Sequence, residues 1–427
     1  MLLIVYNIFF TLLIPILIIN LFRKSKKNQK YKHHIKERLS LKIPNVKSPI
    51  WIHAVSVGEN IAISPLVQSL TLEYPNDDIL ITMMTPTGRD EVKKLYKSNQ
   101  NIYWSYLPYD SSLLLNNFIN KIKPKILILM ETEIWPILIN TCYKNKIPII
   151  LNNARLSNKS KSNYQKILPI SKNIMNKISY FSCQSQHDAN NFIALGTEKN
   201  KVSITGNIKF DMELSNSKIE LGKHFKKLFC NKKIWIASST HSGEDEIILR
   251  AHKIISKVID NSILIIVPRH PERFEEVYNQ ALTFKFQTIR RTELTVDNYN
   301  DQDVIIGNSM GEMMSYYYAS HIAFVGGSLV KNGGHNILEP ALLKLPIVSG
   351  PSLYNFKETM ELFITADAIS IVHDSNSLAK SIINLFKNPI KFKKMTAAAS
   401  AILKQHRGAL ERQKNIIKYN LNQVKDK

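Results

Sequence analysis

The sequence predicts an α/β protein with two doubly wound parallel sheets and an apolar helix at its N-terminus. Three observations lead to this prediction. Residues 1–22 carry no charged side chain, short apolar runs alternate with amphipathic stretches after them, and this alternation stops near residue 213 and restarts near residue 234. Alternation of this kind is typical of parallel sheets with helices on both faces. A chain of 427 residues is long enough for two such domains, each with its own core.

Residues 1–22 are predicted to be a transmembrane anchor. As a helix they would span roughly 33 Å, which matches a bilayer core, and Pro15 is tolerated in such a helix. No basic residues precede the segment and no small-residue cleavage site follows it, so a signal peptide is the weaker interpretation. The alternative is an N-terminal core helix of a soluble protein.

Residues 23–48 form a basic juxtamembrane segment. Residues 23–47 hold ten Lys/Arg and one Glu, and residues 380–427 hold twelve against two acids, so 48–379 carry only +4 of the net charge of +23. By the positive-inside rule the first cluster lies in the cytoplasm against anionic lipids, with the rest of the chain on the same side. The near-neutral body argues against a nucleic-acid groove.

The first domain is expected over residues 49–212. Helical patterns such as 62–72, 87–96, 113–122 and 135–144 separate its apolar runs. The predicted strands are Ile50–Val57, Ile79–Met84, Ile102–Tyr106, Ile126–Leu129, Ile149–Asn152, Tyr180–Cys183 and Val202–Ile204.

A polar, lysine-rich stretch at 213–233 is predicted to be a linker, and the second domain is expected over 234–405. Residues 406–427 are predicted to form a basic C-terminal helix that packs back on the first domain. Two such sheets would create a cleft between the carboxyl ends of their strands, where open sheets bind ligands. The strands predicted for the second domain are Ile234–Thr240, Ser262–His270, Asp303–Asn308, His321–Leu329, Pro346–Gly350 and Ala368–Val372.

Three ionisable residues follow strands of the first domain. Glu59 comes after the first strand in "WIHAVSVGEN", Glu131 follows the fourth in "LMETEIWP", and Lys209 follows the last in "GNIKFD". These side chains are therefore expected at one edge of the sheet, where a carboxylate could act as a general base and a lysine could stabilise a departing phosphate. For Glu59 alone, an acid that stabilises a helix N-terminus is an equally good account.

In the second domain, "FVGGSLVKNGGHNILEPALL" (324–343) has two glycine pairs before a predicted helix that begins near Asn336. Glycines let a backbone approach a ligand, and a helix N-terminus offers unpaired N–H donors to a phosphate. Glu339 could accept hydrogen bonds from ribose hydroxyls. Arg269, at the end of a strand, suits bidentate contact with phosphate, and the turn 310–312 follows another strand.

The sequence gives little sign of metal or disulfide chemistry. Its three cysteines, Cys142, Cys183 and Cys230, are far apart and are each expected to be a small buried side chain. No zinc-binding pattern, G-x-x-x-x-G-K-[ST] loop or G-x-S-x-G motif occurs. No cofactor and no metal are therefore expected.

Taken together, these motifs resemble the family of 3-deoxy-D-manno-octulosonic acid (Kdo) transferases, membrane enzymes of lipid A inner-core assembly in lipopolysaccharide biosynthesis. The resemblance covers nearly the whole chain, and its motifs occur in the family's order. They are "KERLS", "HAVSVGE", "TPTGRD", "ETEIWP", "NARLSNKS", "GNIKFD", "VPRHPERF", "SMGEM", "FVGGSLVKNGGHNILEPA" and "GPSLYNF".

The resemblance implies a GT-B fold, in which two Rossmann-like domains enclose the cleft. It also implies CMP-Kdo as donor, a lipid A precursor (lipid IVA) as acceptor, inversion at the anomeric carbon and no essential metal. The implied location is the cell inner membrane, single-pass, with the catalytic domains on the cytoplasmic side.

By matched motif, Glu59 looks like the proton acceptor, and Glu131 and Lys209 look like transition-state stabilisers. The implied CMP contacts are Pro268, Arg269, Met310, Gly311, Glu312, Asn336, Ile337, Leu338 and Glu339.

Three departures from the family pattern stand out. Asn308 takes the place of the usual Asp, Asn158-Lys159 replace an acidic-basic pair, and Ile337 replaces a proline. Asn308 puts one polar contact in doubt, and none of the three touches the implied base.

Two alternatives stay open at this stage. One is a UDP-sugar-dependent transferase or epimerase of the same architecture, and the other is a non-catalytic, membrane-tethered basic protein that binds lipid.

Overall fold

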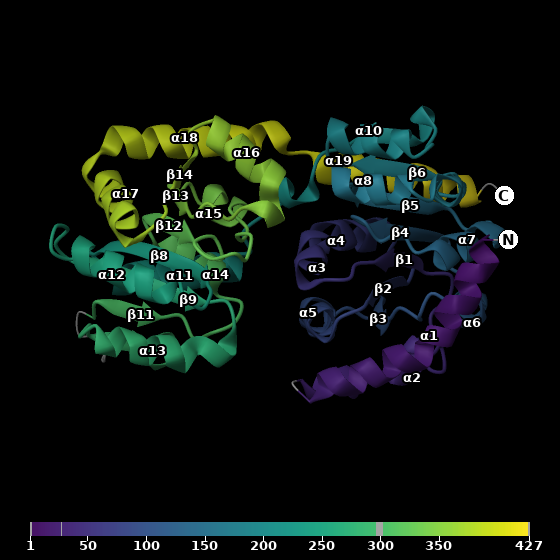
Figure 1. Cartoon of the computed structure of the whole chain (residues 1–427), viewed down its shortest axis with the longest axis horizontal. Helices are drawn as coiled ribbons and strands as arrows, with labels where there is room; N and C mark the ends of the chain where they lie inside the picture. Colours follow the sequence, from purple (N-terminus) through teal and green to yellow (C-terminus); the bar gives the residue numbers. More distant parts are fainter. Residues whose placement is uncertain (1, 27, 296–301, 426–427) are drawn as a thin grey trace. The chain divides into compact units, whose positions relative to one another are not determined.

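Two units with separate cores make up the chain. In the computed structural model, which describes residues 2–26, 28–295 and 302–425, unit 1 comprises Met1–Asp211 and Arg407–Lys427, and unit 2 comprises Met212–His406. Each unit contains one seven-stranded sheet in which every pair of neighbouring strands is parallel (Figure 1).

The sheet of unit 1 has the strand order β3-β2-β1-β4-β5-β6-β7. The order reverses between β1 and β4, so the carboxyl ends of these two strands mark the topological switch point, where open α/β sheets bind ligands. The strands are β1 Ile50–His53, β2 Ile79–Met83, β3 Ile102–Tyr106, β4 Ile126–Met130, β5 Ile149–Ala154, β6 Tyr180–Cys183 and β7 Val202–Ile204.

Every residue of β1, β2 and β4 is buried, because helices cover both faces of the sheet. Such strands read as continuous apolar runs instead of alternating ones. Successive side chains still point to opposite faces: Trp51 belongs to one core cluster, and Ile50 and Ile52 belong to the other.

The predicted first strand, 50–57, is too long at its C-terminal end. β1 ends at His53, and Val57 is already the first residue of helix α3. The reason is local: Ser56 caps the helix by accepting a hydrogen bond from the Glu59 N–H, which ends the extended backbone. The helices that flank this sheet are α3 Val57–Ala62, α4 Ser64–Glu73, α5 Pro86–Tyr96, α6 Ser112–Ile122, α7 Pro136–Lys144, α8 Asn158–Gln165, α9 Leu168–Met175, α10 Gln186–Ala194 and α19 Ala409–Lys425.

The N-terminal region of unit 1 comprises α1 Leu2–Ser25, the 3-10 turn η1 Gln29–Lys32 and α2 Ile35–Arg38. Among the described residues, α1 is the one helix that is long and apolar enough to cross a membrane. One face of α1 is docked on unit 1 beside α6 and α7 (Figure 1): the Ser112 N–H donates to Asn7 Oδ1 at 2.8 Å, and Thr11 Oγ1 lies 2.9 Å from Ser111 Oγ. Its other face exposes apolar side chains such as Leu12.

The sheet of unit 2 has the order β10-β11-β9-β8-β12-β13-β14, with its switch point between β8 and β12. Its edge strand β10 is missing from the sequence prediction, because only one of its three residues, Ile289, is apolar and no apolar run marks it. The strands are β8 Lys233–Thr240, β9 Ser262–Pro268, β10 Thr288–Arg290, β11 Val304–Ile306, β12 Ile322–Val325, β13 Ile347–Ser349 and β14 Ile369–Ile371.

Residues 213–233, for which the sequence predicts a linker, contain helix α11 Asn216–Leu228. Its apolar residues recur at helical spacing and pack into the core of unit 2: Phe225 is buried and stacks on Tyr316 with ring centroids 5.5 Å apart. Cys230 lies in the turn after α11 and is exposed, so the expectation of burial is wrong for this cysteine, whereas Cys142 and Cys183 are buried.

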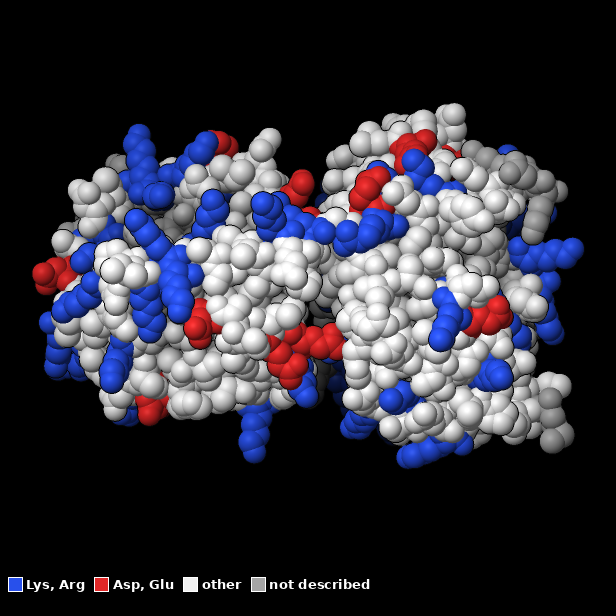
Figure 2. All heavy atoms as spheres, turned by 90° about the horizontal axis from the view of Figure 1, so that it is seen from above, with Lys and Arg blue, Asp and Glu red and all other residues white. Residues whose placement is uncertain are grey.

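The other helices of unit 2 include two with many exposed lysines. Figure 2 shows many Lys and Arg side chains and few acidic ones on one face of this unit, and on α17 and α18 the exposed lysines are Lys380, Lys387, Lys393, Lys394 and Lys404. The helices are α12 Asp245–Ile255, α13 Phe274–Thr283, α14 Met313–Ala319, α15 Leu338–Leu342, α16 Lys357–Thr365, α17 Ser375–Lys387 and α18 Pro389–His406.

Candidate functional site

Glu59 lies in the first turn of α3, directly after the central strand β1. Its carboxylate folds back on the start of its own helix: Ser56 Oγ donates to Oε1 at 2.7 Å and the Val55 N–H donates to Oε2 at 2.9 Å. The Glu59 N–H in turn donates to Ser56 Oγ at 3.3 Å. Together these three hydrogen bonds fix the carboxylate at the carboxyl edge of the sheet.

The surroundings of Glu59 raise the pKa of its carboxyl group. Partial burial is the largest cause, and the negative charges of Glu131 and Glu133 act in the same direction. The hydrogen bonds from Ser56 and Val55 oppose the shift because they favour the charged form. A carboxylate with a raised pKa holds a proton more readily than an ordinary glutamate, which is what a general base needs.

Glu131 and Lys209 form an ion pair next to this carboxylate. Glu131 follows β4, the strand beside β1, and its Oε1 lies 2.7 Å from Nζ of Lys209. Glu131 has a positive φ of 53°, a conformation that costs energy for a residue with a Cβ. The structure thus brings Glu59, Glu131 and Lys209 together at the switch point of the first sheet.

A second acid, Glu133, joins this edge. Trp135 Nε1 donates to Glu133 Oε2 at 2.8 Å, and the same oxygen lies 3.7 Å from Nε2 of the fully buried His53. The other ring nitrogen of His53 lies 2.9 Å from Thr82 Oγ1. Glu133 lies in the same segment as Glu131, "LMETEIWP", but the sequence indicated no role for it. His53 was not predicted as a site residue, because a histidine inside an apolar strand is typical of a buried core position.

The C-terminal helix α19 holds the segment that carries Lys209. Lys209 lies in the 3-10 turn η3 Ile208–Asp211, and the Asp211 carboxylate accepts hydrogen bonds from the N–H groups of Gly408 and Leu410 at 2.7 and 2.6 Å. The buried Gln413 accepts a hydrogen bond from Asn152 at 2.8 Å. Nothing in the sequence pattern pointed to these contacts, since residues some 200 positions apart make them.

In unit 2, the backbone amides of the loop after β12 are bound to an internal carboxylate. The N–H groups of Gly327, Ser328 and Leu329 donate to the buried Glu244 carboxylate at 2.7, 2.9 and 2.9 Å, and the His241 N–H donates to it at 2.9 Å. An internal carboxylate therefore fixes the backbone of this loop. The helix N-terminus for which the sequence predicts unpaired donors lies further along the chain, near Asn336.

The segment 336–339 forms the entry to α15, which begins at Leu338. Asn336 Oδ1 accepts a hydrogen bond from the Leu338 N–H at 3.1 Å, and its amide nitrogen donates to Glu339 Oε1 at 3.2 Å. The side chains of Ile337 and Leu338 are buried, so a ligand here would meet their backbone. Burial raises the pKa of Glu339, while the hydrogen bond from Asn336 and the positive charges of Lys218 and Arg269 lower it.

Arg269 is exposed directly after β9, and the preceding Pro268 is buried. Close to Arg269 lie two histidines that the sequence did not single out: the rings of His241 and His335 stack with centroids 5.1 Å apart, and their Nε2 atoms are 2.8 Å apart. Burial, helped by the charge of Arg269, lowers the pKa of His335 to about 4. At neutral pH one imidazole therefore donates to the other, with His270 edge-on to His241.

The turn 310–312 follows β11, which pairs with β9. Met310 is exposed, and Gly311 has a φ of 85° that favours glycine. The Glu312 carboxylate accepts from Ser309 Oγ at 2.6 Å and pairs with Arg291 at 3.1 Å. The predicted nucleotide contacts thus lie after three strands, β9, β11 and β12, at the carboxyl edge of the second sheet.

Asn308, which stands where the related pattern has Asp, makes a reciprocal pair of hydrogen bonds with Thr292. Its Oδ1 accepts from the Thr292 N–H at 3.0 Å, and its Nδ2 donates to Thr292 Oγ1 at 2.8 Å. Among the described residues, no group of three or more His, Cys, Asp or Glu side chains is placed to hold a metal ion.

Comparisons with known proteins agree with this arrangement. Residues 33–212 match the family model described as 3-Deoxy-D-manno-octulosonic-acid transferase (kdotransferase). The chain is 38% identical over 400 residues to the 3-deoxy-D-manno-octulosonic acid transferase of Haemophilus influenzae, covering 92% of this chain and 93% of that one. It is 30% identical to the transferase of the same name from Bordetella pertussis, covering 86% of each chain.

Among solved structures, UDP-GlcNAc 2-epimerase from Neisseria meningitidis, solved with UDP-GlcNAc bound, superposes with a TM-score of 0.58 over 87% of this chain and 99% of its own, at 15% identity. At that identity the likeness shows the fold alone, a GT-B-like pair of parallel sheets. The extended sequence identity to the two transferases is the stronger finding. The chain belongs to the 3-deoxy-D-manno-octulosonic acid (Kdo) transferase family and is a glycosyltransferase.

Proposed function

We propose that the protein transfers Kdo from CMP-Kdo to a hydroxyl group of a lipid A precursor, lipid IVA, with inversion at the anomeric carbon. The observation that carries the proposal is the cluster at the switch point of the first sheet. There, a partly buried carboxylate with a raised pKa, Glu59, lies beside the ion pair of Glu131 and Lys209.

In this proposal Glu59 removes the proton from the acceptor hydroxyl as that oxygen attacks the donor sugar. A sugar hydroxyl is a poor nucleophile at neutral pH, so it needs a base within hydrogen-bond reach. Ser56 and Val55 hold the two carboxylate oxygens in place. Each oxygen still has a lone pair with which to accept the acceptor's proton.

Lys209 and Glu131 stabilise the transition state. Negative charge builds up on the departing CMP phosphate, and the Kdo sugar carries a carboxylate of its own. A preorganised ammonium group opposes both charges most effectively in a site with little water. The 2.7 Å contact with Glu131 holds the flexible lysine side chain in one position.

Unit 2 holds the donor nucleotide. Arg269 contacts the phosphate, Glu339 accepts hydrogen bonds from ribose hydroxyls, and the backbone of 336–338 and of 310–312 frames the nucleotide. The proposal involves no cofactor and no metal ion. Helix α1 and the basic segment 23–48 hold the protein at the cytoplasmic side of the inner membrane, where anionic lipids attract the lysines.

The direct test is to incubate the full chain in detergent or lipid discs with CMP-Kdo and a tetraacylated lipid A precursor and to weigh the products. We expect the precursor to gain the mass of one or more Kdo residues and CMP to be released. A precursor of unchanged mass, with a folded protein, would reject the proposal.

Nucleotide choice separates this function from a UDP-sugar enzyme of the same fold. Only a nucleotide that binds the folded state raises its melting temperature. We expect CMP to raise the Tm, and UDP and GDP at equal concentration to leave it unchanged. Stabilisation by UDP instead of CMP would favour the alternative.

The substitution Arg269→Ala should weaken CMP binding. A hydrogen bond to a charged group contributes about 1.5–3 kcal/mol, so the Kd for CMP should rise about 10- to 100-fold in a calorimetric titration. Arg250→Ala is the matched control. Arg250 is an exposed arginine of the same unit, and it forms an ion pair with Glu246 one turn earlier on its own helix. An unchanged Kd in Arg269→Ala would remove this residue from the site.

A further inference from the structure

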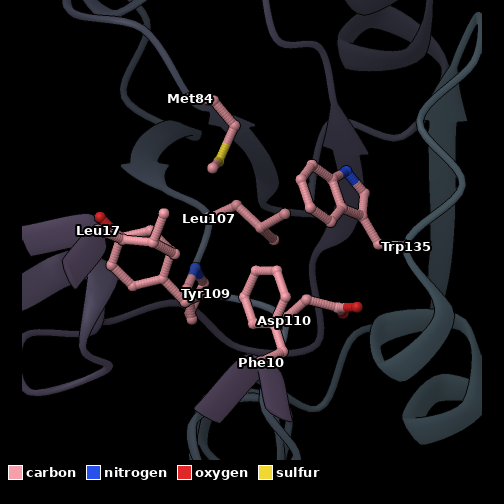
Figure 3. A pocket seen from close by; sticks show the side chains of 8 residues that line it. Phe10, Leu17, Met84, Leu107, Tyr109, Asp110 and Trp135 are labelled. Carbon is pink, nitrogen blue, oxygen red and sulfur yellow. The ribbon is translucent and has the colours of Figure 1, made fainter. Parts of the chain in front are cut away.

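A cavity of about 240 Å³ lies where α1 docks on unit 1 (Figure 3). Phe10 and Leu17 reach into it from α1, and the rest of its wall comes from the loops that follow β2, β3 and β4. Apolar atoms dominate the lining, which consists of Phe10, Leu17, Met84, Leu107, Pro108, Tyr109, Asp110 and Trp135.

The polar groups of two lining residues are turned to partners outside the cavity. Asp110 accepts hydrogen bonds from Tyr6 Oη at 3.1 Å and from the N–H groups at the start of α7 at 2.8 and 3.1 Å. The indole N–H of Trp135 donates to Glu133. Water needs two to four polar partners to occupy a cavity, so this one suits a hydrocarbon better than water.

A second pocket, of about 150 Å³, lies next to the first, and basic side chains outnumber acidic ones in its lining. Lys30 pairs with Asp90 and Arg89 pairs with Glu37, each at 2.6 Å, so Lys93 is the lining lysine best placed to meet an anion. Met84 of the apolar cavity and Pro86 of the basic pocket belong to one loop, and Leu107 and Tyr106 are consecutive residues that line one pocket each. The lining of the basic pocket is Lys30, His33, His34, Pro86, Arg89, Asp90, Lys93 and Tyr106.

We propose that the two pockets form one site for the lipid acceptor, in which the apolar cavity takes an acyl chain and the basic pocket takes a phosphate group. This inference rests on the proposed function, because it names the part of unit 1 that would hold the lipid A precursor. A molecule that carries both chemistries side by side is an acylated, phosphorylated lipid. The exposed apolar side chains of α1, such as Leu12 and Ile16, suit contact with the membrane that holds such a lipid.

The apolar cavity is also connected to the candidate base. Trp135 forms part of its wall and donates a hydrogen bond of 2.8 Å to Glu133, a residue whose charge acts on Glu59. A lipid whose acyl chain fills the cavity would therefore have its sugar head group near the carboxylate cluster. The binding energy of the acyl chain, which is remote from the reacting atoms, would in this way position the acceptor hydroxyl.

The acyl half of the site is tested with Leu17→Trp, which fills the cavity, in the full chain reconstituted in lipid discs. Each buried methylene is worth about 0.8 kcal/mol, or roughly fourfold in affinity, so displacing two of them should raise KM for a tetraacylated precursor by about tenfold or more. KM for a fully deacylated precursor and for CMP-Kdo should not change. Leu12→Trp, on the exposed face of the same helix, is the matched control and should alter none of these values.

The phosphate half is tested with Lys93→Gln against Lys94→Gln, an exposed neighbour outside the pocket lining. We expect Lys93→Gln to raise KM for the bisphosphorylated precursor about fivefold, in line with the loss of roughly 1 kcal/mol from one charge contact, and to leave KM for a dephosphorylated precursor unchanged. Lys94→Gln should behave as wild type. Equal KM values in both variants would overturn this half.

A photoreactive lipid tests the site without catalytic turnover. The probe is a tetraacylated precursor that carries a diazirine in one acyl chain. We expect labelling on α1 and near Trp135, lost in Leu17→Trp. If the wild type makes no Kdo product but is labelled there, the proposed function fails and the lipid site stands. Kdo product without labelling of these residues would contradict the proposed site. So would equal labelling of these residues by a diazirine phosphatidylglycerol that the precursor does not displace.

Discussion

Glu59→Gln should lower kcat for Kdo transfer by about 10²–10⁴-fold, the range in which a positioned general base contributes. Glutamine keeps the size of the side chain: its amide oxygen can accept from the Val55 N–H, and its NH2 group can donate to the Ser56 hydroxyl, which donates to Glu59 in the wild type. It cannot take up the proton of the acceptor hydroxyl. The Kd for CMP should stay at its wild-type value, because the residues proposed to bind the nucleotide all belong to unit 2.

The measurement is the initial rate of transfer at saturating donor and acceptor, with CMP affinity from calorimetry. Glu198→Gln serves as the control, since Glu198 is an exposed acid of unit 1 that pairs with Lys201. It should retain the wild-type rate. A purified, folded Glu59→Gln protein with full activity would show that Glu59 only caps its helix.

Lys209→Met should have the second largest effect, a fall in kcat of about 10²–10³-fold, as expected when a preorganised electrostatic contact to the transition state is lost. The variant removes the ammonium group 2.7 Å from Glu131 and leaves that carboxylate without its counter-charge. KM for the acceptor should change little, because the lost interaction matters most when charge has moved to the leaving phosphate.

Lys209→Arg should recover part of the rate, whereas a lysine with a purely structural role would tolerate methionine. The control is Lys201→Met, which breaks an exposed ion pair with Glu198 at 2.9 Å in the same unit. A Lys209→Met protein with wild-type kcat would contradict the proposed stabilisation. Equal losses in both lysine variants would point to folding instead of chemistry.

The sequence was enough to predict that Glu131 and Lys209 lie at the same edge of the sheet, although 78 positions separate them. Both follow strands, and a parallel sheet places all the carboxyl ends of its strands at one edge. The same reasoning put Glu59 beside them. The prediction of this cluster therefore did not require the order of the strands within the sheet.

The loop after β12 contains a contact that such reasoning cannot find. The N–H groups of Gly327, Ser328 and Leu329 bind the buried Glu244. Glu244 lies more than 80 positions away, directly before α12, and its sequence neighbours read as an ordinary helix start. Only the packed structure reveals that this carboxylate fills the loop.

The histidine pair and the polar contacts of the C-terminal helix were missed for a similar reason, although the helix itself was predicted. His241 follows β8 and His335 lies in the loop after β12, and these strands are neighbours only in the folded sheet. Likewise, Gln413 of α19 meets Asn152 of β5. The positions of most strands and of single charged residues after them can be read from local patterns, whereas contacts between distant polar residues depend on the strand order.

The pH dependence of transfer tests the role of Glu59 most directly. A base must be ionised to act, so the rate is lost as pH falls through its pKa. Because burial and neighbouring acids raise the pKa of Glu59, the acid limb of the rate should lie above the ordinary value of 4.5.

The hydrogen bond from Ser56 favours the ionised form of Glu59 and lowers its pKa. In Ser56→Ala, measured under conditions where the protein stays folded, the acid limb of kcat should therefore move to higher pH. Ser157→Ala, which removes an equivalent helix cap at α8, should leave it in place. An acid limb at the same pH in Ser56→Ala and wild type would contradict the claim that Glu59 is the group that accepts the proton.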